Sequence, residues 1–209
     1  MAKKGRPPKK AIRTTTNSTK RTKPRRKSGT RKRSSNSRRV WLGLGSNLGD
    51  RRAFIESALE EISRIASLRR VSALYATEPV GDVEQPDFFN AAAEILWRGS
   101  PEEILAAVKA IERKVGRRPT HVNGPREIDV DILDFGGAIR TDSDPILPHP
   151  RLSARRFALA PLAEIAPRWR HPISRLTARQ LLKRLPVSPS VRRLNIRPDI
   201  RRIRAGRPY

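Results

Sequence analysis

The sequence predicts an α+β protein with a ferredoxin-like βαββαβ core, in which helices flank an antiparallel sheet and extra helices follow at the C-terminal end. Two observations predict this fold. Segments with the two-residue alternation of strands and segments with the 3.6-residue period of helices follow one another in that order. An almost neutral region over residues 40–185 also lies between two strongly basic ends, which indicates one folded domain with two tails.

The first half of this core begins with a short apolar run that ends in glycines. VWLGLG at 40–45 is typical of a buried strand. Apolar residues at helical spacing over 51–66 predict an amphipathic helix, and the turn before it offers Asn47 or Asp50 as its N-cap. The segment RRVSALYAT at 69–77 alternates like a second strand.

The second half repeats the pattern of strand, helix and strand. FFNAAAEILW at 88–97 predicts a strand. Ser100 opens a capping box with Pro at the first helical position, and the helix that follows is expected to end at Gly116. EIDVDILDF at 127–135 completes the βαββαβ order. Two further helices are predicted over 154–166 and 177–185.

Charge is distributed unevenly along the 209 residues. Of the formal net charge of +26, residues 1–39 carry +17 without any acidic residue, and residues 184–209 carry +7. Residues 1–39 have too few apolar side chains to offset the entropy of ordering, so we expect a disordered basic tail. Residues 186–209 contain Pro and Arg with little periodicity, and we expect a basic, loosely ordered C-terminal tail.

The N-terminal tail has three interpretations. It is favoured to be a solvated segment with weak, salt-sensitive affinity for polyanions. Gly5-Arg6-Pro7 in a Lys-rich setting also resembles the core of an AT-hook, which would bind the DNA minor groove. A mitochondrial transit peptide would share the Arg- and Ser-rich composition, but no amphipathic helical pattern is visible.

Composition excludes several classes of protein. The chain has no Cys, so disulfide frameworks and thiolate metal sites are excluded. No apolar run approaches the ~20 residues that a bilayer-spanning helix needs, and no signal-peptide core is visible. We therefore expect a soluble, cytoplasmic protein without membrane contact.

The strand at 127–135 carries two aspartates two residues apart. Asp129 and Asp131 alternate with apolar residues, so both carboxylates are expected on one face of the sheet, where they would repel each other. The face is either plain solvent or the seat of a cation such as Mg²⁺, which prefers oxygen ligands and often shares them with substrate phosphates. Arg126 precedes the strand, and Arg117 and Arg118 follow the second helix, as phosphoryl transfer would require.

Three other motifs allow both a structural and a functional interpretation. GLGSNLGD at 43–50 matches neither a Walker A loop nor a dinucleotide fingerprint, which favours a tight turn. His149 lies between two prolines in LPHPRLSARRF; it is either a polar loop residue or a group aimed at a phosphate or at proton transfer. Phe88 and Asn90 in PDFFNAA are either core residues or a stacking ring and an amide for a flat ligand.

Taken together, these segments resemble a known family. GSN after the first strand, EPVG and QPDFFNA, IERKVGR, GPREIDVDIL and LPHPRLSARRF occur in the order found in the 6-hydroxymethyl-7,8-dihydropterin pyrophosphokinases of folate biosynthesis. The resemblance covers about residues 40–185. It implies a ferredoxin-like fold and the transfer of diphosphate from ATP to the hydroxymethyl group of the pterin, with release of AMP.

The resemblance also implies roles for individual residues. Asp129 and Asp131 would hold two Mg²⁺ ions that clamp the ATP phosphates, with Arg117 and Arg126 as catalytic arginines. The remaining ATP contacts would come from Glu112, Ile132, His149 and Arg155. The pterin would lie between Phe88 and Phe157, with its edge bonded by Asn90 and by the segment that contains Thr77, Pro79 and Val80.

Partners follow from the same resemblance and from the tails. ATP and a dihydropterin would be the substrates, and the chain would work beside, or docked to, a dihydropteroate synthase. The basic tails allow weak contact with DNA or another polyanion. Two rival hypotheses are a nucleic-acid-associated protein with a degenerate active site and a ferredoxin-like regulatory module without catalysis.

Overall fold

The structure is a computed structural model that describes residues 1–2, 5, 37–79, 85–121 and 124–205. Contacts divide the chain into two units, Met1–Arg33 and Ser34–Tyr209. In the first unit only residues 1–2 and 5 are described, and they form neither helix nor strand. The expected disordered tail and its polyanion contacts therefore lie outside the described residues.

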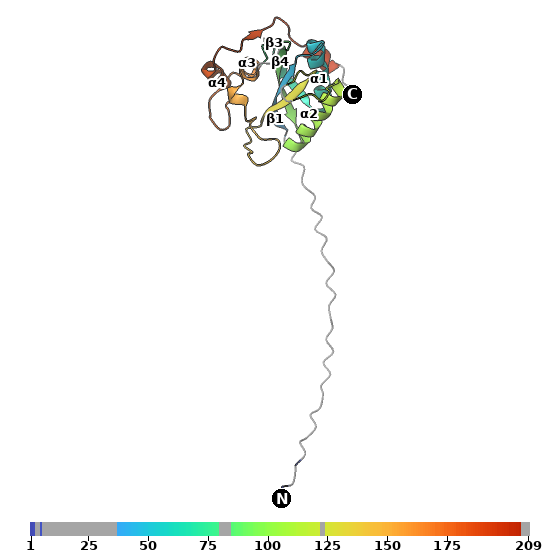
Figure 1. The fold of residues 1–209 in the computed structure, drawn as a ribbon, viewed down its shortest axis with the longest axis vertical. Coiled ribbons are helices and arrows are strands. Elements are labelled where there is room, and N and C mark those ends of the chain that lie inside the picture. The colour runs from blue at the N-terminus through green and yellow to red at the C-terminus, as the bar shows by residue number, and fades with distance from the viewer. Residues whose placement is uncertain (3–4, 6–36, 80–84, 122–123, 206–209) are drawn as a thin grey trace. The chain divides into compact units, whose positions relative to one another are not determined.

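The second unit is an α+β fold (Figure 1). Its elements are, in chain order, β1 (Arg38–Ser46), α1 (Arg51–Ile65), β2 (Ser67–Val71), β3 (Tyr75–Thr77), β4 (Phe88–Trp97), α2 (Pro101–Val115), β5 (Asp129–Phe135), a 3₁₀ turn η1 (Leu152–Ala154), α3 (Arg156–Ile165), α4 (Ala178–Arg184), β6 (Val191–Arg193) and α5 (Ile200–Ala205). The sheet order is β5-β1-β4-β3-β6, and β2 also pairs with β4. Every pairing between these strands is antiparallel, which confirms the ferredoxin-like prediction.

The strand predicted over 69–77 is two strands in the structure. β2 and β3 both pair with β4, and the chain leaves the sheet between them at 72–74. The break begins at Ser72. Its side-chain hydroxyl, instead of a backbone carbonyl, accepts the hydrogen bond of the Ala92 backbone N–H at 3.0 Å. The alternation of apolar residues continued across this break, so the pattern alone did not reveal it.

Two apolar cores lie on the two faces of the sheet, because strand residues alternate in direction. Leu42 and Leu44 of β1 belong to a core formed with α1, α2 and α5, while Trp41 belongs to a second core formed with α3 and α4. Figure 1 shows α1 and α2 on one side of the sheet and α3 and α4 on the other. The predicted C-terminal helices thus cover the face that the βαββαβ core leaves open.

The helix ends follow the predicted chemistry. The hydroxyl of Ser100 accepts from the N–H of Glu103 and the carboxylate of Glu103 accepts from the N–H of Ser100, so α2 begins with the expected capping box. Gly116 ends this helix at φ 112°, in the left-handed region that favours glycine. Of the two candidate caps for α1, the structure selects Asp50, which accepts from Ala53 N at 3.0 Å.

The C-terminal segment is more ordered than the sequence predicted. β6 pairs with β3 through three residue pairs, and Ile203 of α5 is 4 % exposed within the core on the α1 side. The expectation of a loose tail over 186–209 therefore needs correction as far as residue 205, beyond which the structure describes nothing. Periodicity missed these elements because a three-residue strand and a six-residue helix are too short to show a period.

Within the described part of the chain, no helix combines the length and the apolar character needed to cross a bilayer. The longest described helices, α1 and α2, have 15 residues each and one polar face.

The first prediction tests the folded C-terminal segment. Ile203→Ala removes a buried side chain and is expected to lower the free energy of unfolding by about 2–5 kcal/mol, measured by urea denaturation. Val187→Ala is the matched control, because Val187 is 76 % exposed in the same segment and should change stability by less than about 0.5 kcal/mol. Equal, small effects of both substitutions would mean that the segment is a loose tail after all.

Candidate active site

The centre of the site is a strip of bare backbone on the central strand. Gly43 and Gly45 of β1 lie opposite Asp131 and Asp129 of β5, so both carboxylates project from one face of the sheet, as predicted. On the other side of the strip, Gly45 lies opposite Asn90 of β4. A Cβ atom on Gly45 would lie 3.0 Å from Asn90 Oδ1, so glycine leaves room here between the carboxylates and the amide.

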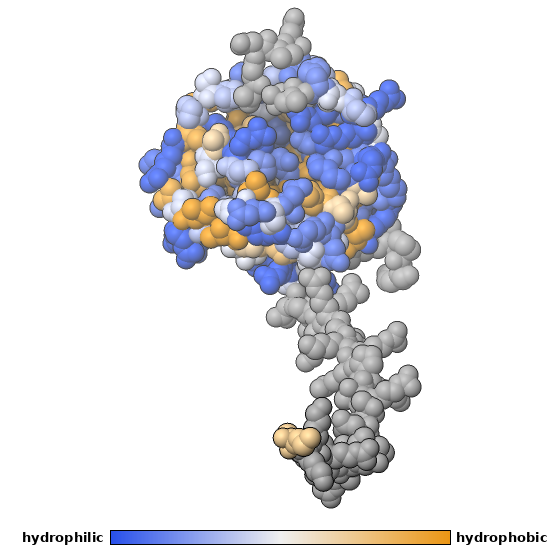
Figure 2. Space-filling model, turned by 60° about the horizontal axis from the view of Figure 1, so that its bottom comes forward, coloured by the Kyte–Doolittle hydropathy of each residue, from blue (hydrophilic) through white to orange (hydrophobic). Residues whose placement is uncertain are grey.

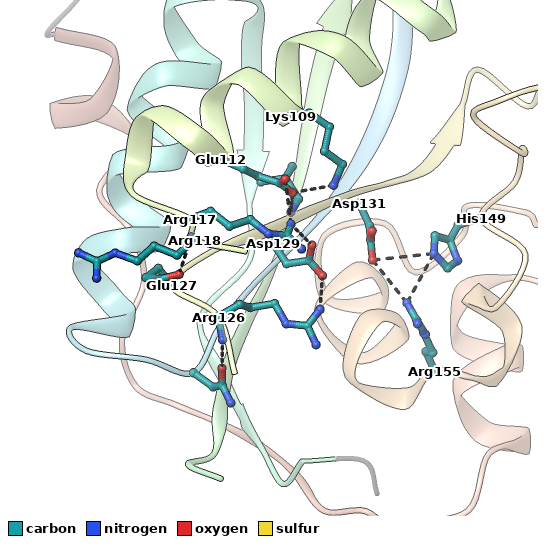
Figure 3. A network of polar contacts seen from close by, with 12 residues as sticks. Lys109, Glu112, Arg117, Arg118, Arg126, Glu127, Asp129, Asp131, His149 and Arg155 are labelled. Carbon is teal, nitrogen blue, oxygen red and sulfur yellow. Dashed lines mark hydrogen bonds and ion pairs between the residues drawn. The ribbon is translucent and has the colours of Figure 1, made fainter. Parts of the chain in front are cut away.

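The Asp129 carboxylate is held by two guanidinium groups (Figure 3). Arg117 Nη1 lies 2.6 Å from Oδ1, and Arg126 Nη1 lies 3.1 Å from Oδ2. Burial raises the pKa of Asp129, but the positive charges of Arg117 and Arg126 outweigh it and hold the pKa below the usual range. Asp129 is therefore an ionised carboxylate that already has two cationic partners.

Glu112 positions this cluster from α2. It is 2 % exposed and accepts from the backbone N–H of Val130 at 2.7 Å, which fixes the helix to the start of β5. Its carboxylate also pairs with Lys109 Nζ and Arg117 Nη1, both at 2.8 Å. Arg117 thus bridges Glu112 and Asp129, and these two carboxylates raise its pKa against the effect of burial.

Asp131 faces a different pair of side chains, shown on the other side of the network in Figure 3. Arg155 Nη1 lies 3.4 Å and His149 Nε2 lies 3.8 Å from Asp131 Oδ2. The His149 ring is oriented by its Nδ1 atom, which accepts from the backbone N–H of Arg151 at 3.1 Å. Burial lowers the pKa of His149. The negative charge of Asp131 raises it, but the positive charges of Arg155 and Arg151 lower it again, so the net shift is downward.

The loop that carries Arg126 is tied to the turn after β1. Asn47, 1 % exposed, accepts from the backbone N–H of Arg126 at 2.7 Å, and its own N–H donates to the Arg126 carbonyl at 3.1 Å. Its amide also donates to Gln85 Oε1 and to the Pro86 carbonyl. The sequence indicated Asn47 only as a possible N-cap of α1; its place in the GSN motif after β1 was the available signal.

The predicted ring-binding residues lie next to the arginines. The guanidinium of Arg126 lies 5.6 Å from the ring centroid of Phe88, and that of Arg155 lies 5.4 Å from the ring of Phe157. Neither ring is fully buried. Asn90 donates from Nδ2 to Thr77 Oγ1 at 2.8 Å, which orients the amide on the face of the glycine strip.

The structure does not bring every predicted site residue to this face. Ile132 is 5 % exposed and packs in the core on the α1 side, so a contact between its side chain and a nucleotide is not supported. Pro79 follows β3 and is half-buried. Val80 lies outside the described residues.

Charges in the network nearly balance. Three carboxylates (Glu112, Asp129 and Asp131) lie among four cationic side chains (Lys109, Arg117, Arg126 and Arg155). No cluster of three or more metal-ligating side chains occurs among the described residues, so the protein offers a cation only the two strand carboxylates here. Such a partial oxygen site suits Mg²⁺, which completes its shell with water and phosphate.

One buried donor in the cluster has no partner. The Nε atom of Arg126 is inaccessible to solvent and makes no hydrogen bond within the described structure. A buried N–H group without an acceptor is costly, and an anionic ligand between Arg126 and the aspartates would supply one. Carboxylates and converging guanidinium groups on one face of a sheet are an arrangement that phosphoryl-transfer enzymes use.

Two surface hollows lie elsewhere and contain none of these residues. They measure about 350 and 330 Å³ and share Arg39 and Arg70 in their walls, at the opposite ends of the strands from the glycine strip. Figure 2 shows that hydrophilic side chains dominate the face drawn there, with apolar ones in small groups.

Comparison with known proteins places the chain in one family. Residues 41–167 match the 7,8-dihydro-6-hydroxymethylpterin-pyrophosphokinase (HPPK) family. A 2-amino-4-hydroxy-6-hydroxymethyldihydropteridine pyrophosphokinase of Methylorubrum extorquens is 43 % identical over 131 residues, which are 62 % of this chain and 83 % of the relative. The chain therefore belongs to the HPPK family.

Longer relatives share the same region. The folic acid synthesis protein FOL1 of Dictyostelium discoideum is 35 % identical over 147 residues, which cover 70 % of this chain but 22 % of that protein. A crystal structure of Plasmodium falciparum HPPK-DHPS matches with a TM-score of 0.57 at 15 % identity, over 70 % of this chain and 44 % of that one. At that identity the likeness supports the fold alone.

The second prediction concerns the arginine that bridges two carboxylates. Arg117→Met leaves Asp129 with one guanidinium fewer, so Mg²⁺ alone should raise the Tm of the variant more than that of the parent chain. Loss of one of the two cationic partners of buried Glu112 should also lower the free energy of unfolding without Mg²⁺ by about 1–3 kcal/mol. Thermal unfolding with and without Mg²⁺ measures both effects.

Arg113→Met is the matched control, because Arg113 is exposed on the same helix and lies outside the network. It should respond to Mg²⁺ like the parent chain. An identical Mg²⁺ shift in all three proteins would show that Arg117 and the cation do not compete for Asp129.

Proposed function

We propose that this chain transfers the diphosphate group of ATP to the hydroxymethyl group of 6-hydroxymethyl-7,8-dihydropterin, releasing AMP, as a step of folate biosynthesis. One observation carries the proposal. Asp129 and Asp131 with their arginines lie on one side of the bare strip of β1, and Asn90 lies on the other side, on the same face of the sheet. A phosphate site and a site for a flat acceptor would thus lie side by side on the same face of the sheet.

The ATP side would use Arg117, Arg126 and Arg155. Their guanidinium groups now contact carboxylates, and each can instead donate to phosphate oxygens. Mg²⁺ held by Asp129 and Asp131 would neutralise phosphate charge when bound, and two ions with ATP are part of the proposal. If a cation occupied the aspartates, Arg126 and Arg155 would be available to the nucleotide, while Arg117 would keep its pairing with Glu112. The pKa of His149 is lowered, and Nδ1 accepts from Arg151 N–H, so the neutral ring would carry its proton on Nε2 and donate one hydrogen bond to a phosphate oxygen.

The acceptor side would use Phe88, Phe157 and Asn90. A pterin is a flat bicycle with a polar edge, and it suits two aromatic rings and an amide. Thr77 already accepts one N–H of the Asn90 amide, which leaves the other N–H and the carbonyl oxygen for the pterin edge. Glycine at position 45 lets the Asn90 amide lie against the central strand, because a Cβ there would be 3.0 Å from Asn90 Oδ1.

The chemical step needs one bond made and one broken. The pterin hydroxymethyl oxygen bonds to the β-phosphorus, the bond from that phosphorus to the oxygen bridging the α-phosphate breaks, and AMP leaves with both bonding electrons. The hydroxyl proton needs an acceptor. Both oxygens of Asp129 accept from guanidinium groups at 2.6 and 3.1 Å, whereas the contacts of Asp131 are 3.4 and 3.8 Å. Asp131 is therefore the better placed acceptor.

Two partner proposals remain from the sequence. Association with a dihydropteroate synthase is supported by the Plasmodium HPPK-DHPS chain, of which this chain matches 44 %. Contact of the N-terminal segment with DNA or another polyanion stays a prediction, as does a cytoplasmic location. Neither rival hypothesis gains support, because the polar residues of the predicted site converge in space.

The test of the function is AMP release by the purified full-length chain with ATP, Mg²⁺ and 6-hydroxymethyl-7,8-dihydropterin. AMP should form only when the pterin is present, and ADP should not form. Diphosphate transfer would be refuted by a folded, ATP-binding chain that releases no AMP with the pterin, or that releases ADP.

The third prediction assigns the catalytic carboxylate. Asp131→Ala should fold like the parent chain and lower turnover by about 10²-fold or more, since it removes an oxygen ligand and the proposed proton acceptor. Asp142→Ala is the control, because Asp142 is exposed in the loop after β5 and should leave turnover unchanged. The assay is the initial rate of AMP formation at saturating ATP. Turnover near that of the parent would remove Asp131 from the catalytic site.

A further inference from the structure

The C-terminal strand β6 lies outside the residues matched by the family, yet it borders the proposed pterin site. The family match ends at residue 167, whereas β6 spans 191–193. β6 pairs with β3 in the register Thr77↔Val191, Ala76↔Arg192 and Tyr75↔Arg193. β3 is therefore held between β4 and β6. Without β6 it would be a three-residue edge strand with unpaired backbone groups.

The pairing extends beyond the strand and is anchored at its C-terminal end. Leu194 N donates to the Leu74 carbonyl at 2.8 Å, and Leu74 N donates to the Ile196 carbonyl at 2.9 Å. Further along, Ser63 Oγ of α1 donates to the carbonyl of Ile203 at 3.3 Å. The segment between β6 and α5 is thus hydrogen-bonded to the residue before β3, and α5 itself is hydrogen-bonded to α1.

Glu164 of α3 joins the same strands from the opposite face. Its carboxylate accepts from Ala73 N at 3.2 Å and from the Tyr75 hydroxyl at 2.8 Å, and it pairs with Arg193 and Arg197. Burial and the Glu164 bond raise the pKa of Tyr75 to about 12, so its hydroxyl stays a donor. Two arginines that the sequence assigned to a basic tail are therefore ion-paired within the fold.

The N-terminal end of β6 reaches the proposed pterin residues. Ser190 Oγ donates to Glu78 Oε1 at 2.8 Å, and Ser190 N donates to Glu78 Oε2 at 3.4 Å. Glu78 directly follows Thr77, whose Oγ1 accepts from the Asn90 amide at 2.8 Å. A chain of contacts therefore runs from Ser190 through Glu78 and Thr77 to the amide that would bond the pterin edge.

We propose that β6 is a positioning element for the pterin: through its pairing with β3 and the Ser190–Glu78 bond, it fixes Thr77 and hence the orientation of the Asn90 amide. This inference rests on the proposed pyrophosphokinase activity and names the substrate that β6 serves. The proposed ATP groups come instead from α2, β5 and the region of η1, and no described contact joins them to β6. β6 should therefore affect the pterin and leave ATP binding unchanged.

The fourth prediction uses Ser190→Ala in the full-length chain. Removing the hydroxyl donor should raise the KM for the pterin by about two- to tenfold, the range for one hydrogen bond, with the KM for ATP unchanged. Glu78→Ala should have a similar effect. The double variant should be no worse than the worse single variant, because both substitutions break the same bond. Equilibrium titration of the pterin, with a non-hydrolysable ATP analogue and Mg²⁺ present, should show the same shift in Kd.

Thr177→Ala is the control for a purely structural effect. Thr177 caps α4 through Gln180, so its loss should lower Tm without moving the KM for the pterin. The inference is overturned if Ser190→Ala leaves both KM values unchanged, shifts both in parallel, or adds its full effect to that of Glu78→Ala. If the parent chain itself forms no pterin-dependent AMP, the proposed function has failed instead, which the same assay shows before any variant is tested.

Discussion

The arrangement of charge around Asp129 is the constraint on which the rest of the site depends. Two carboxylates two residues apart on one strand face repel each other, and the chain balances them with arginines from three separate segments. Arg117 follows α2 and Arg126 precedes β5, so their contacts to Asp129 close both ends of the intervening loop onto the sheet. In the proposed function a cation would bind these carboxylates, and the arginines would exchange a carboxylate for a phosphate oxygen.

The two faces of the sheet differ in composition, and this difference supports the site. The face toward α1 and α2 is closed and apolar, and it receives Ile132 and Val130, the residues that alternate with the aspartates. The other face is closed by α3 and α4 over one end only, and Gly43, Gly45, Asn90 and both aspartates occupy the remaining end. Glycine at position 45 has a steric consequence: a Cβ there would lie 3.0 Å from Asn90 Oδ1, so its absence lets the amide lie close to the central strand. Buried Glu112 and Asn47 then connect the loops at the rim to the sheet through backbone N–H groups.

Several features of fold and site could be predicted because they depend on neighbours in sequence. The capping box at Ser100, the left-handed Gly116 and the common face of Asp129 and Asp131 all follow from spacings of two to four residues. Asn47 could not be assigned, because its partners are Arg126, 79 residues away, and the segment 85–86. The burial of Ile132 on the opposite face was already implicit in the alternation that identified the aspartates, so its assignment to the nucleotide conflicted with the strand pattern itself.

By itself the sequence determined the order of elements, the ends of the main helices, the face of the carboxylates and the family, because each is written in local periodicity or in a contiguous motif. The tertiary structure alone decided which arginine neutralises which carboxylate and how the C-terminal segment is used. The sequence indicated Arg193 and Arg197 only as charges of a tail. In the structure both pair with Glu164, which lies about 30 residues earlier in the chain. Strand β6 is too short to show a period, and it becomes a strand because β3 offers an unpaired edge. Long-range pairing has no local signature, so charge and periodicity could describe these residues only as exposed and unstructured.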